Sequence, residues 1–427
     1  FNGAGELQDD AGSYGIFAQS VGGGGGVGGS GKLKGIPFGG SIPGCEICGK
    51  ISFGWGVGLG AAGGKGGDGG AVTVDVEGGS IRTGGESSPA IFAQSVGGGG
   101  GIAGVTALSP LTTGGFIESV RGTAVGSGSA SGSGGIVEVD YTGLIATTGD
   151  ASHGIFAQSV GGGKKTAAKA DLRSFGKAVT INFAGSLSAT GEDAHGILAQ
   201  SGGADGAGNV TVDIAEGSVV SGGKKGMTNN GAGIMIMDGA SNMLTNAGTV
   251  TSAGGIKGVA VAHTGVGQLE VDNSGAILGD VLLGKNGRFN NRSGGRVEAR
   301  LIDLGGNGVL SNEKNGVVYP GGDSRLGLTR IEGNLLTAGI LAEDIDDAEA
   351  DRVNVTGTAF LGGFVVPIIS NIQQRSQQYT ILSAAGGTTN QGITVEDTAV
   401  IDYQLLFPNP NDMVLGIELD FSASGLN

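Results

Sequence analysis

A unit of nearly constant length recurs along the chain, and it restricts the possible folds more than any other feature of the sequence. Each copy starts with a valine-rich strand at Val72, Val137 or Val179 and ends with the glutamine of an Ile-Phe-Ala-Gln or Ile-Leu-Ala-Gln string. The copies run from 72 to 94, from 137 to 158 and from 179 to 200, so their lengths agree to within one position. The intervals from each glutamine to the next unit instead become steadily shorter, from 19 to 72, 94 to 137, 158 to 179 and 200 to 210. A constant unit with variable insertions at one corner is typical of a solenoid.

Side chains within each unit alternate in a way that predicts parallel strands. Val72, Val74 and Val76 are separated by single polar residues, so one face of this strand is apolar and the other is polar. One coil cannot bury its apolar face alone, whereas stacked coils with parallel strands about 4.8 Å apart can do so. We therefore predict an all-β fold, a right-handed parallel β-helix of about a dozen coils and roughly 60 Å, with glycine-rich loop insertions.

Composition agrees with a thin aliphatic core and excludes other classes of protein. Glycine provides 95 of the 427 residues, but it lacks the three-residue period of collagen, and 38% hydrophobic residues are too many for a disordered linker. Aromatic residues make up only 5%, so aliphatic side chains must fill the core. The net charge of −15 argues against nucleic acid as a partner. No apolar run is long enough to predict a transmembrane helix.

The Ile-Phe-Ala-Gln-Ser-Val string forms one face of each predicted coil, and the glycines after it lead the chain out into loops. Stacking of the coils aligns four glutamines, Gln19, Gln94, Gln158 and Gln200. Their side chains either hydrogen-bond to each other along the stack or are held in place by packing alone.

A second signature continues the repeat in the C-terminal half. Four asparagines recur at one turn, about once per predicted coil, namely Asn246, Asn273, Asn291 and Asn312. Stacked asparagines can form hydrogen bonds from coil to coil, and asparagine also tolerates the left-handed conformation of a turn. Both interpretations, a hydrogen-bonded column and four independent turns, stay open on the sequence alone.

Residues that could support catalysis do not form a convincing constellation. His153 and His195 precede the repeated string at a position that Tyr14 and Pro89 occupy in other copies, which indicates a turn rather than a Ser-His-Asp triad. The only aligned carboxylates, as a polysaccharide hydrolase would require, are Asp75, Asp140 and Asp213. We expect the third repeat to interrupt their row with Phe183 or a nearby neutral residue. The sequence therefore predicts no catalytic residue, no cofactor and no metal site.

Two cysteines, Cys45 and Cys48, lie in a Gly/Pro-rich insertion. Redox enzymes use this C-x-x-C spacing at a helix start, and a zinc site would require a second pair of ligands. We expect instead a small disulfide that closes an exported loop in an oxidising compartment.

An acidic run from Ala342 to Val355 leads into a predicted strand. Its carboxylates could bind calcium weakly at residues 343–351, but the spacing of an EF-hand is absent. We predict a solvated acidic edge.

Longer strings in the C-terminal third carry a resemblance to a known family. The strings are "GLTRIEGNLLTAGILAEDIDDAEADRVNVTGTAFLGG" from Gly327 and "QYTILSAAGG" from Gln378. They resemble the end of an autotransporter passenger, the exported part of a type V secreted protein of Gram-negative bacteria. The "HGIFAQSVGGG" copies are similar to glycine-rich repeats of large members of that family.

The resemblance implies a signal peptide, a β-helical passenger exported through the periplasm, and the passenger's own C-terminal β-barrel in the outer membrane as a partner. Because the sequence contains neither a signal peptide nor a barrel, we expect a passenger piece cut from a longer chain. By the same resemblance, the segment from about Gly339 to Asp420 is a β cap that ends the solenoid and aids folding during export. A cap also protects the unpaired backbone of an open end.

We therefore expect three regions: a glycine-rich β-helix with long insertions (1–240), a β-helix with Asn-Gly turns (241–338) and a cap (339–427). The predicted function is a non-enzymatic adhesin or display rod, on the cell surface or secreted. It would bind host or bacterial surface molecules, glycans among them, through many weak contacts. One alternative is a self-associating extracellular fibre or biofilm matrix protein. Another is an enzyme that acts on polysaccharides.

Overall fold

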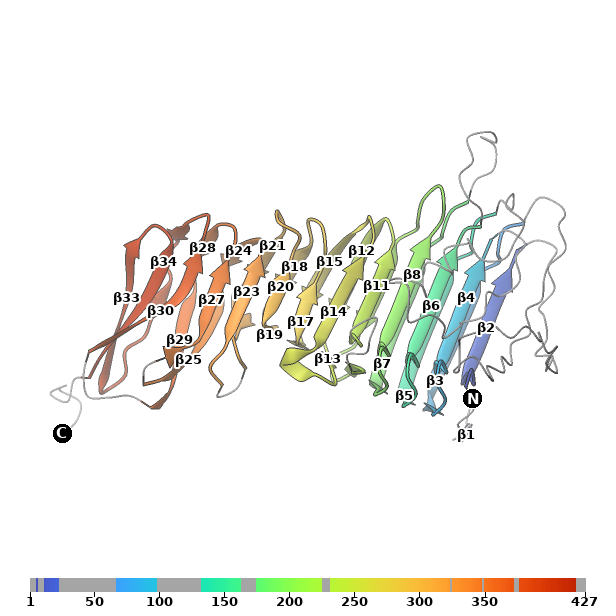
Figure 1. The fold of residues 1–427 in the computed structure, drawn as a ribbon, viewed down its shortest axis with the longest axis horizontal. Coiled ribbons are helices and arrows are strands. Elements are labelled where there is room, and N and C mark those ends of the chain that lie inside the picture. The colour runs from blue at the N-terminus through green and yellow to red at the C-terminus, as the bar shows by residue number, and fades with distance from the viewer. Residues whose placement is uncertain are drawn as a thin grey trace, which may run out of the picture.

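The chain is almost entirely β structure and elongated, as the computed structural model in Figure 1 shows. The structure describes residues 5–6, 11–22, 67–97, 132–162, 174–224, 231–322, 325–347, 349–371 and 376–419. Within these ranges the one helical element is the short 3-10 helix η2, Gly255–Lys257. None of the helical structure described there is long and apolar enough to cross a membrane.

A 13-stranded sheet extends over the whole length of the molecule. Its first eleven strands pair in parallel, each with the equivalent strand of the next coil. We use "coil" for the chain from one of these strands to the next. The strands are β2 Ile16–Val21, β4 Ile91–Val96, β6 Ile155–Val160, β8 Ile197–Gly202, β11 Ile234–Asp238, β14 Val259–Thr264, β17 Asp280–Leu282, β20 Leu301–Asp303, β23 Leu328–Glu332, β27 Arg352–Val355 and β30 Gln377–Ala384.

A 21-stranded sheet contains two further runs of parallel strands. Three long strands belong to both runs: β3 Val72–Thr83, β5 Val137–Thr147 and β7 Val179–Ala189. The first run continues from them through β9 Val210–Ile214, β12 Ser241–Asn246, β15 Gln268–Asn273, β18 Arg288–Asn291, β21 Val309–Asn312, β24 Asn334–Thr337, β28 Ala359–Leu361 and β31 Thr388–Asn390. The second contains β1 Gly5–Glu6, β10 Val219–Gly222, β13 Thr249–Ser252, β16 Ala276–Leu278, β19 Arg296–Glu298, β22 Val317–Val318, β25 Ile340–Asp346, β29 Phe364–Asn371 and β32 Thr394–Val395. The two-residue strand β26, Glu349–Ala350, pairs with β25 as a hairpin. These long parallel runs are consistent with a β-solenoid.

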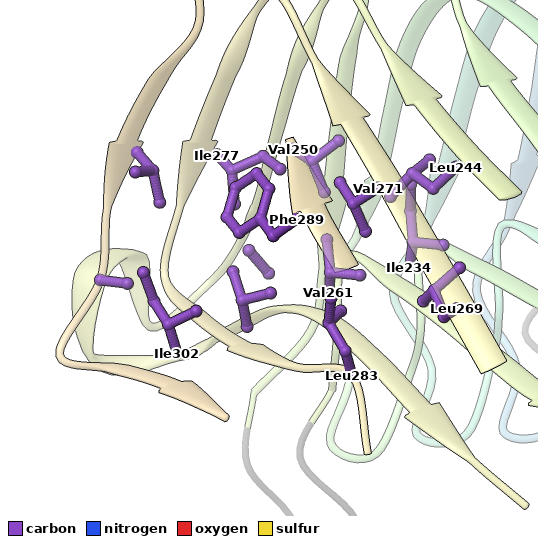
Figure 2. Packing of buried hydrophobic residues seen from close by; sticks show 14 of the residues in the cluster. Ile234, Leu244, Val250, Val261, Leu269, Val271, Ile277, Leu283, Phe289 and Ile302 are labelled. Atoms are coloured by element: carbon purple, nitrogen blue, oxygen red, sulfur yellow. The ribbon is translucent and has the colours of Figure 1, made fainter. Parts of the chain in front are cut away.

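The core is a continuous column of aliphatic side chains between the three runs of strands. On β5 the residues Val137, Val139 and Ile145 are at most 1% exposed and Tyr141 is 2% exposed, while Glu138 and Thr142 between them face outward. Figure 2 shows the same layering farther along, where Val271 and Phe289 from successive coils point into one interior. Complete burial of each such side chain contributes about 1.5–3 kcal/mol to the free energy of unfolding. Because a coil buries its side chains only against a neighbouring coil, each coil depends on its neighbours for this contribution.

Glycines mark the bends in the long strands, where successive coils touch. Gly143 has a φ of +140° and Gly185 a φ of +133°. A Cβ added to Gly185 would lie 2.0 Å from the carbonyl oxygen of Gly143 in the preceding coil. Only glycine fits here, because both the backbone conformation and the close stacking exclude a side chain.

The C-terminal end of the 13-stranded sheet reverses direction. Strand β34, Asp412–Leu419, pairs antiparallel with β30, and β33, Ile401–Asn409, pairs antiparallel with β34. Leu415 and Ile417 of β34 are buried against the end of the core. The parallel pairing continues through residues 240 and 338, where the sequence analysis divides the chain.

Candidate functional site

Four glutamines form a hydrogen-bonded column on the 13-stranded sheet. Gln19 Nε2 donates to Gln94 Oε1 at 2.6 Å, Gln94 Nε2 to Gln158 Oε1 at 2.5 Å, and Gln158 Nε2 to Gln200 Oε1 at 2.6 Å. Gln158 and Gln200 are completely buried, and Gln94 is 4% exposed. Of the two interpretations that the sequence left open, the structure has the hydrogen-bonded column.

The strand pattern explains why these amides are shielded from water. Ile91 and Ala93 face the main core, so Phe92 and Gln94 lie on the opposite face of β4. On that face Phe92 stacks on Phe17 with ring centroids 5.2 Å apart and contacts Phe156 at 5.0 Å. A second apolar cluster therefore lies on the same face as the buried glutamine column, and hydrogen bonds in a low-dielectric environment are stronger than in water.

A buried polar group that the sequence analysis did not identify ends this column. Gln200 Nε2 donates to Asp238 Oδ2 at 3.0 Å, although the residue level with Gln200 in the register is Met237. Asp238 has a φ of +56°, a left-handed conformation that lets its carboxylate reach the column. Asn242 Nδ2 donates to the Asp238 carbonyl at 2.8 Å. The Asp238-Gly239 pair at the end of β11 is the sequence signal for this turn.

His263 lies beside this group and is also buried. Its Nδ1 lies 3.1 Å from the carbonyl oxygen of Leu283, and its Nε2 lies 3.2 Å from both the Asp238 carbonyl oxygen and Asn242 Nδ2. His263 thus lies within hydrogen-bonding distance of polar groups in the coils before and after its own.

His153 and His195 form a second short column. Their rings stack with centroids 5.1 Å apart, the main-chain N–H of His195 donates to His153 Nδ1 at 3.0 Å, and that of Ala232 donates to His195 Nδ1 at 3.0 Å. Because each Nδ1 accepts a hydrogen bond, both imidazoles are neutral and carry their proton on Nε2. Burial lowers the pKa of His195 to about 4, and burial beside His195 lowers the pKa of His153 well below its usual range.

The four asparagines also form a hydrogen-bonded column. Asn246 Nδ2 donates to Asn273 Oδ1 at 2.7 Å, and the next two bonds, Asn273 to Asn291 and Asn291 to Asn312, measure 2.8 and 2.9 Å. The last donor, Asn312 Nδ2, meets Thr337 Oγ1 at 3.2 Å. Each of the four amides also donates to a main-chain carbonyl oxygen of the next coil, so the column fastens each turn to its neighbour.

The row of aspartates is interrupted in the third repeat by a neutral residue, as predicted. The register aligns Asp75 with Asp140, Asp140 with Asn182, and Asn182 with Asp213. Asn182 Nδ2 donates to Asp140 Oδ1 at 2.6 Å. The sequence predicted Phe183 or a nearby neutral residue at this position, and the register places Asn182, the neutral neighbour of Phe183, there. Phe183 is buried in the core.

Three carboxyl groups of the acidic run are buried. The prediction of a solvated edge was wrong for these three. Glu343 and Asp351 are completely buried, and Asp344 is 4% exposed. Asp344 accepts hydrogen bonds from the Tyr319 hydroxyl at 3.0 Å and the Arg325 main-chain N–H at 2.8 Å. Asp351 accepts from the main-chain N–H groups of Gly327 at 2.6 Å and Asp344 at 3.0 Å.

Burial and the neighbouring carboxyl groups change the ionisation of this cluster. They raise the pKa of Glu343 well above its usual range, and burial raises the pKa of Asp351 to about 7. Glu343 lies on the same face of β25 as the core residues Leu341 and Ile345. In the part of the chain that the structure describes, no group of three His, Cys, Asp or Glu side chains is arranged to hold a metal ion. Cys45 and Cys48 lie outside the described residues.

No known family model matches the chain, and no characterised protein is similar to it in sequence.

Proposed function

We propose that the chain is a right-handed parallel β-helix that serves as a non-enzymatic display rod, the passenger of an autotransporter. The observation that carries the proposal is the set of buried glutamine and asparagine columns, which join successive coils side chain to side chain over much of the rod. These bonds define the spacing and orientation of the coils. Such a support suits the display of the insertions between units, the longest of which falls between Gln19 and Val72 in the sequence.

In this role the rod is exported through the periplasm with its own outer-membrane β-barrel as partner, and it stays on the cell surface or is secreted. Loop tips and the repetitive outer faces bind host or bacterial surface molecules, glycans among them. Weak contacts at many equivalent positions add together, so the adhesion depends on the number of coils.

Adhesion of the purified chain to surface glycans tests the proposal. In the test variant, the insertion between Gln94 and Val137 is cut to the length of the one between Gln200 and Val210. We expect the full chain to bind a glycan array or cultured cells, and the shortened chain to keep its circular dichroism but lose most of the binding. A full chain that binds neither, or a shortened chain that binds as well, contradicts an adhesive role for the loops.

A self-associating fibre is the second candidate function, and one exposed apolar region favours it. Leu336 and Phe360 face outward from adjacent strands, and Phe364 and Val366 follow on β29; these four side chains are 37–45% exposed. Static light scattering against concentration distinguishes the candidates, because a fibre gains mass as concentration rises and a display rod does not.

A further inference from the structure

Three asparagine-glycine pairs lie at corners of the rod in the part of the chain that the structure describes. Asn286-Gly287 joins β17 to β18, Asn307-Gly308 joins β20 to β21, and Asn315-Gly316 joins β21 to β22. The first two occupy the same corner of successive coils, because β18 pairs in register with β21 directly after them. An asparagine before glycine is the dipeptide most open to attack by the next main-chain nitrogen on the side-chain amide, since glycine has no Cβ to obstruct it.

The three glycine nitrogens differ in whether their hydrogen is already bonded. The Gly287 N–H donates to the carbonyl oxygen of Leu304 at 2.9 Å, and the Gly316 N–H donates to that of Glu313 at 2.8 Å. The Gly308 N–H has no acceptor among the described residues. A hydrogen-bonded nitrogen must give up its bond before it can attack a carbon, so Gly308 alone of the three starts without this cost.

The shape of the next coil explains this difference. Five residues, 304–308, separate β20 from β21, and Leu304 among them supplies the acceptor for Gly287 of the preceding coil. One coil later, Gly333 alone separates β23 from β24. This shorter corner accepts the Leu304 N–H at the Glu332 carbonyl, at 3.0 Å, and donates the Asn334 N–H to the Gly308 carbonyl, at 2.9 Å. None of its described residues accepts from the Gly308 N–H.

The side chain of Asn307 is also able to reach that nitrogen. It is exposed, and no described residue forms a hydrogen bond with its amide. Asn286 is half-buried, and the amide of Asn315 donates to Ser293 Oγ at 3.4 Å. Of the three corners, only the one at Asn307 therefore leaves both the amide carbon and the attacking nitrogen available.

We propose that Asn307 is a site of spontaneous deamidation, in which the Gly308 main-chain nitrogen attacks Cγ of Asn307. The new N–Cγ bond closes a succinimide ring, and Nδ2 leaves as ammonia with the hydrogen of the Gly308 nitrogen. Water then opens the ring: attack at Cγ gives aspartate, and attack at the main-chain carbonyl carbon gives isoaspartate, whose backbone runs through the side chain. Both products add a negative charge between β20 and β21. The inference does not depend on the proposed display function, because it concerns main-chain chemistry at one corner.

Incubation of the full chain in a mildly alkaline buffer at physiological temperature, followed by proteolysis and mass spectrometry, tests the proposal. We expect the peptide with Asn307 to convert about tenfold faster than those with Asn286 and Asn315, the factor that corresponds to one hydrogen bond of about 1.4 kcal/mol. The products should include isoaspartate, detected by methyl transfer from S-adenosylmethionine with an isoaspartyl methyltransferase. Asn307→Gln should remove most of this signal, because its longer side chain would have to close a larger ring.

The same chain in concentrated urea is the matched control. Unfolding removes the hydrogen bonds of Gly287 and Gly316, so the three pairs should convert at similar rates there. Similar rates in the folded chain as well, or an Asn307 that stays intact while the unfolded chain converts, would overturn the proposal. A preference for Asn307 that persists in urea would also overturn it, because the neighbouring sequence and not the fold would then set the rate.

Discussion

Gln158 lies in the middle of the glutamine column, and it donates to one neighbour and accepts from the other. We expect Gln158→Leu to lower the free energy of unfolding by about 3 kcal/mol, because it leaves the amide of Gln94 and the carbonyl oxygen of Gln200 unpaired in an apolar environment. Urea denaturation measures the loss. Gln404→Leu, at an exposed position, should change the free energy by less than about 0.5 kcal/mol. Equal losses in both variants would mean that packing alone holds the column.

Glu343 makes the stability of the folded chain depend on pH. The raised pKa values of Glu343 and Asp351 mean that the folded chain retains protons that the unfolded chain releases near its ordinary values of 4.5 and 3.8. This contribution to stability is complete below about pH 4 and is lost as the pH rises toward 7 and beyond. Glu343→Gln carries no ionisable proton, so it should gain stability relative to the wild type as the pH rises.

Melting temperatures from pH 4 to pH 8 measure this difference. Each unit by which the Glu343 pKa is raised corresponds to about 1.4 kcal/mol of relative stabilisation in the variant. His195 acts in the opposite direction, because its lowered pKa removes stability as the pH falls from 6.5 toward about 4. That effect is common to both proteins and cancels in their difference. Glu349→Gln, at an exposed neighbouring position, is the control, and an identical slope in the Glu343 variant would refute the prediction.

Strand β18 offers a matched pair of asparagines at the scale of one element. Asn291 is completely buried and bonds to Asn273, Asn312 and the main chain, whereas its neighbour Asn290 is half-buried and bonds to the carboxylates of Glu270 and Asp272. Because buried unpaired groups remain only in the first case, we expect Asn291→Ala to cost about 3 kcal/mol and Asn290→Ala about 0.5 kcal/mol. Chemical denaturation of both variants decides between a column and independent turns, since independent turns predict similar small losses.

The sequence predicts most of the strands because their spacing is periodic. A constant interval between valine and glutamine fixes the register, so the alignment of Gln94 with Gln158 follows from counting residues. For the break in the aspartate row, counting left Phe183 or a neutral neighbour open. The register places Asn182 there, and a shift of one residue on a strand changes the face. For Glu343, composition suggested a solvated edge, although its spacing from Leu341 and Ile345 places it on the core face. The main-chain bond to His153 and the bond from Gln200 to Asp238 depend on coil-to-coil contacts, which a single unit of sequence does not contain.

At the scale of the molecule, stability should be distributed along the rod as a series of interfaces between neighbouring coils. Gly185→Ala places a Cβ against the Gly143 carbonyl oxygen, so we expect a cost of about 3 kcal/mol. Hydrogen exchange should show the loss of protection concentrated in β5, β7 and β10, with β21 and later strands protected as before. Gly217→Ala is the control: its φ is +74° but its Cβ would meet nothing within 4 Å, so only about 1 kcal/mol of backbone strain is expected. Uniform loss over all strands would indicate one cooperative unit instead.

The parallel stacking of coils has a mechanical consequence. Main-chain hydrogen bonds between successive strands lie along the long axis of the molecule, so tension between its two ends acts on them one after another and not all at once. A terminal coil therefore detaches before its neighbours, and each detached stretch of about 20 residues lengthens the tether by about 70 Å. In the proposed role as a display rod, stepwise unwinding would slow a cell under flow and keep the peak force from the bond to its substrate.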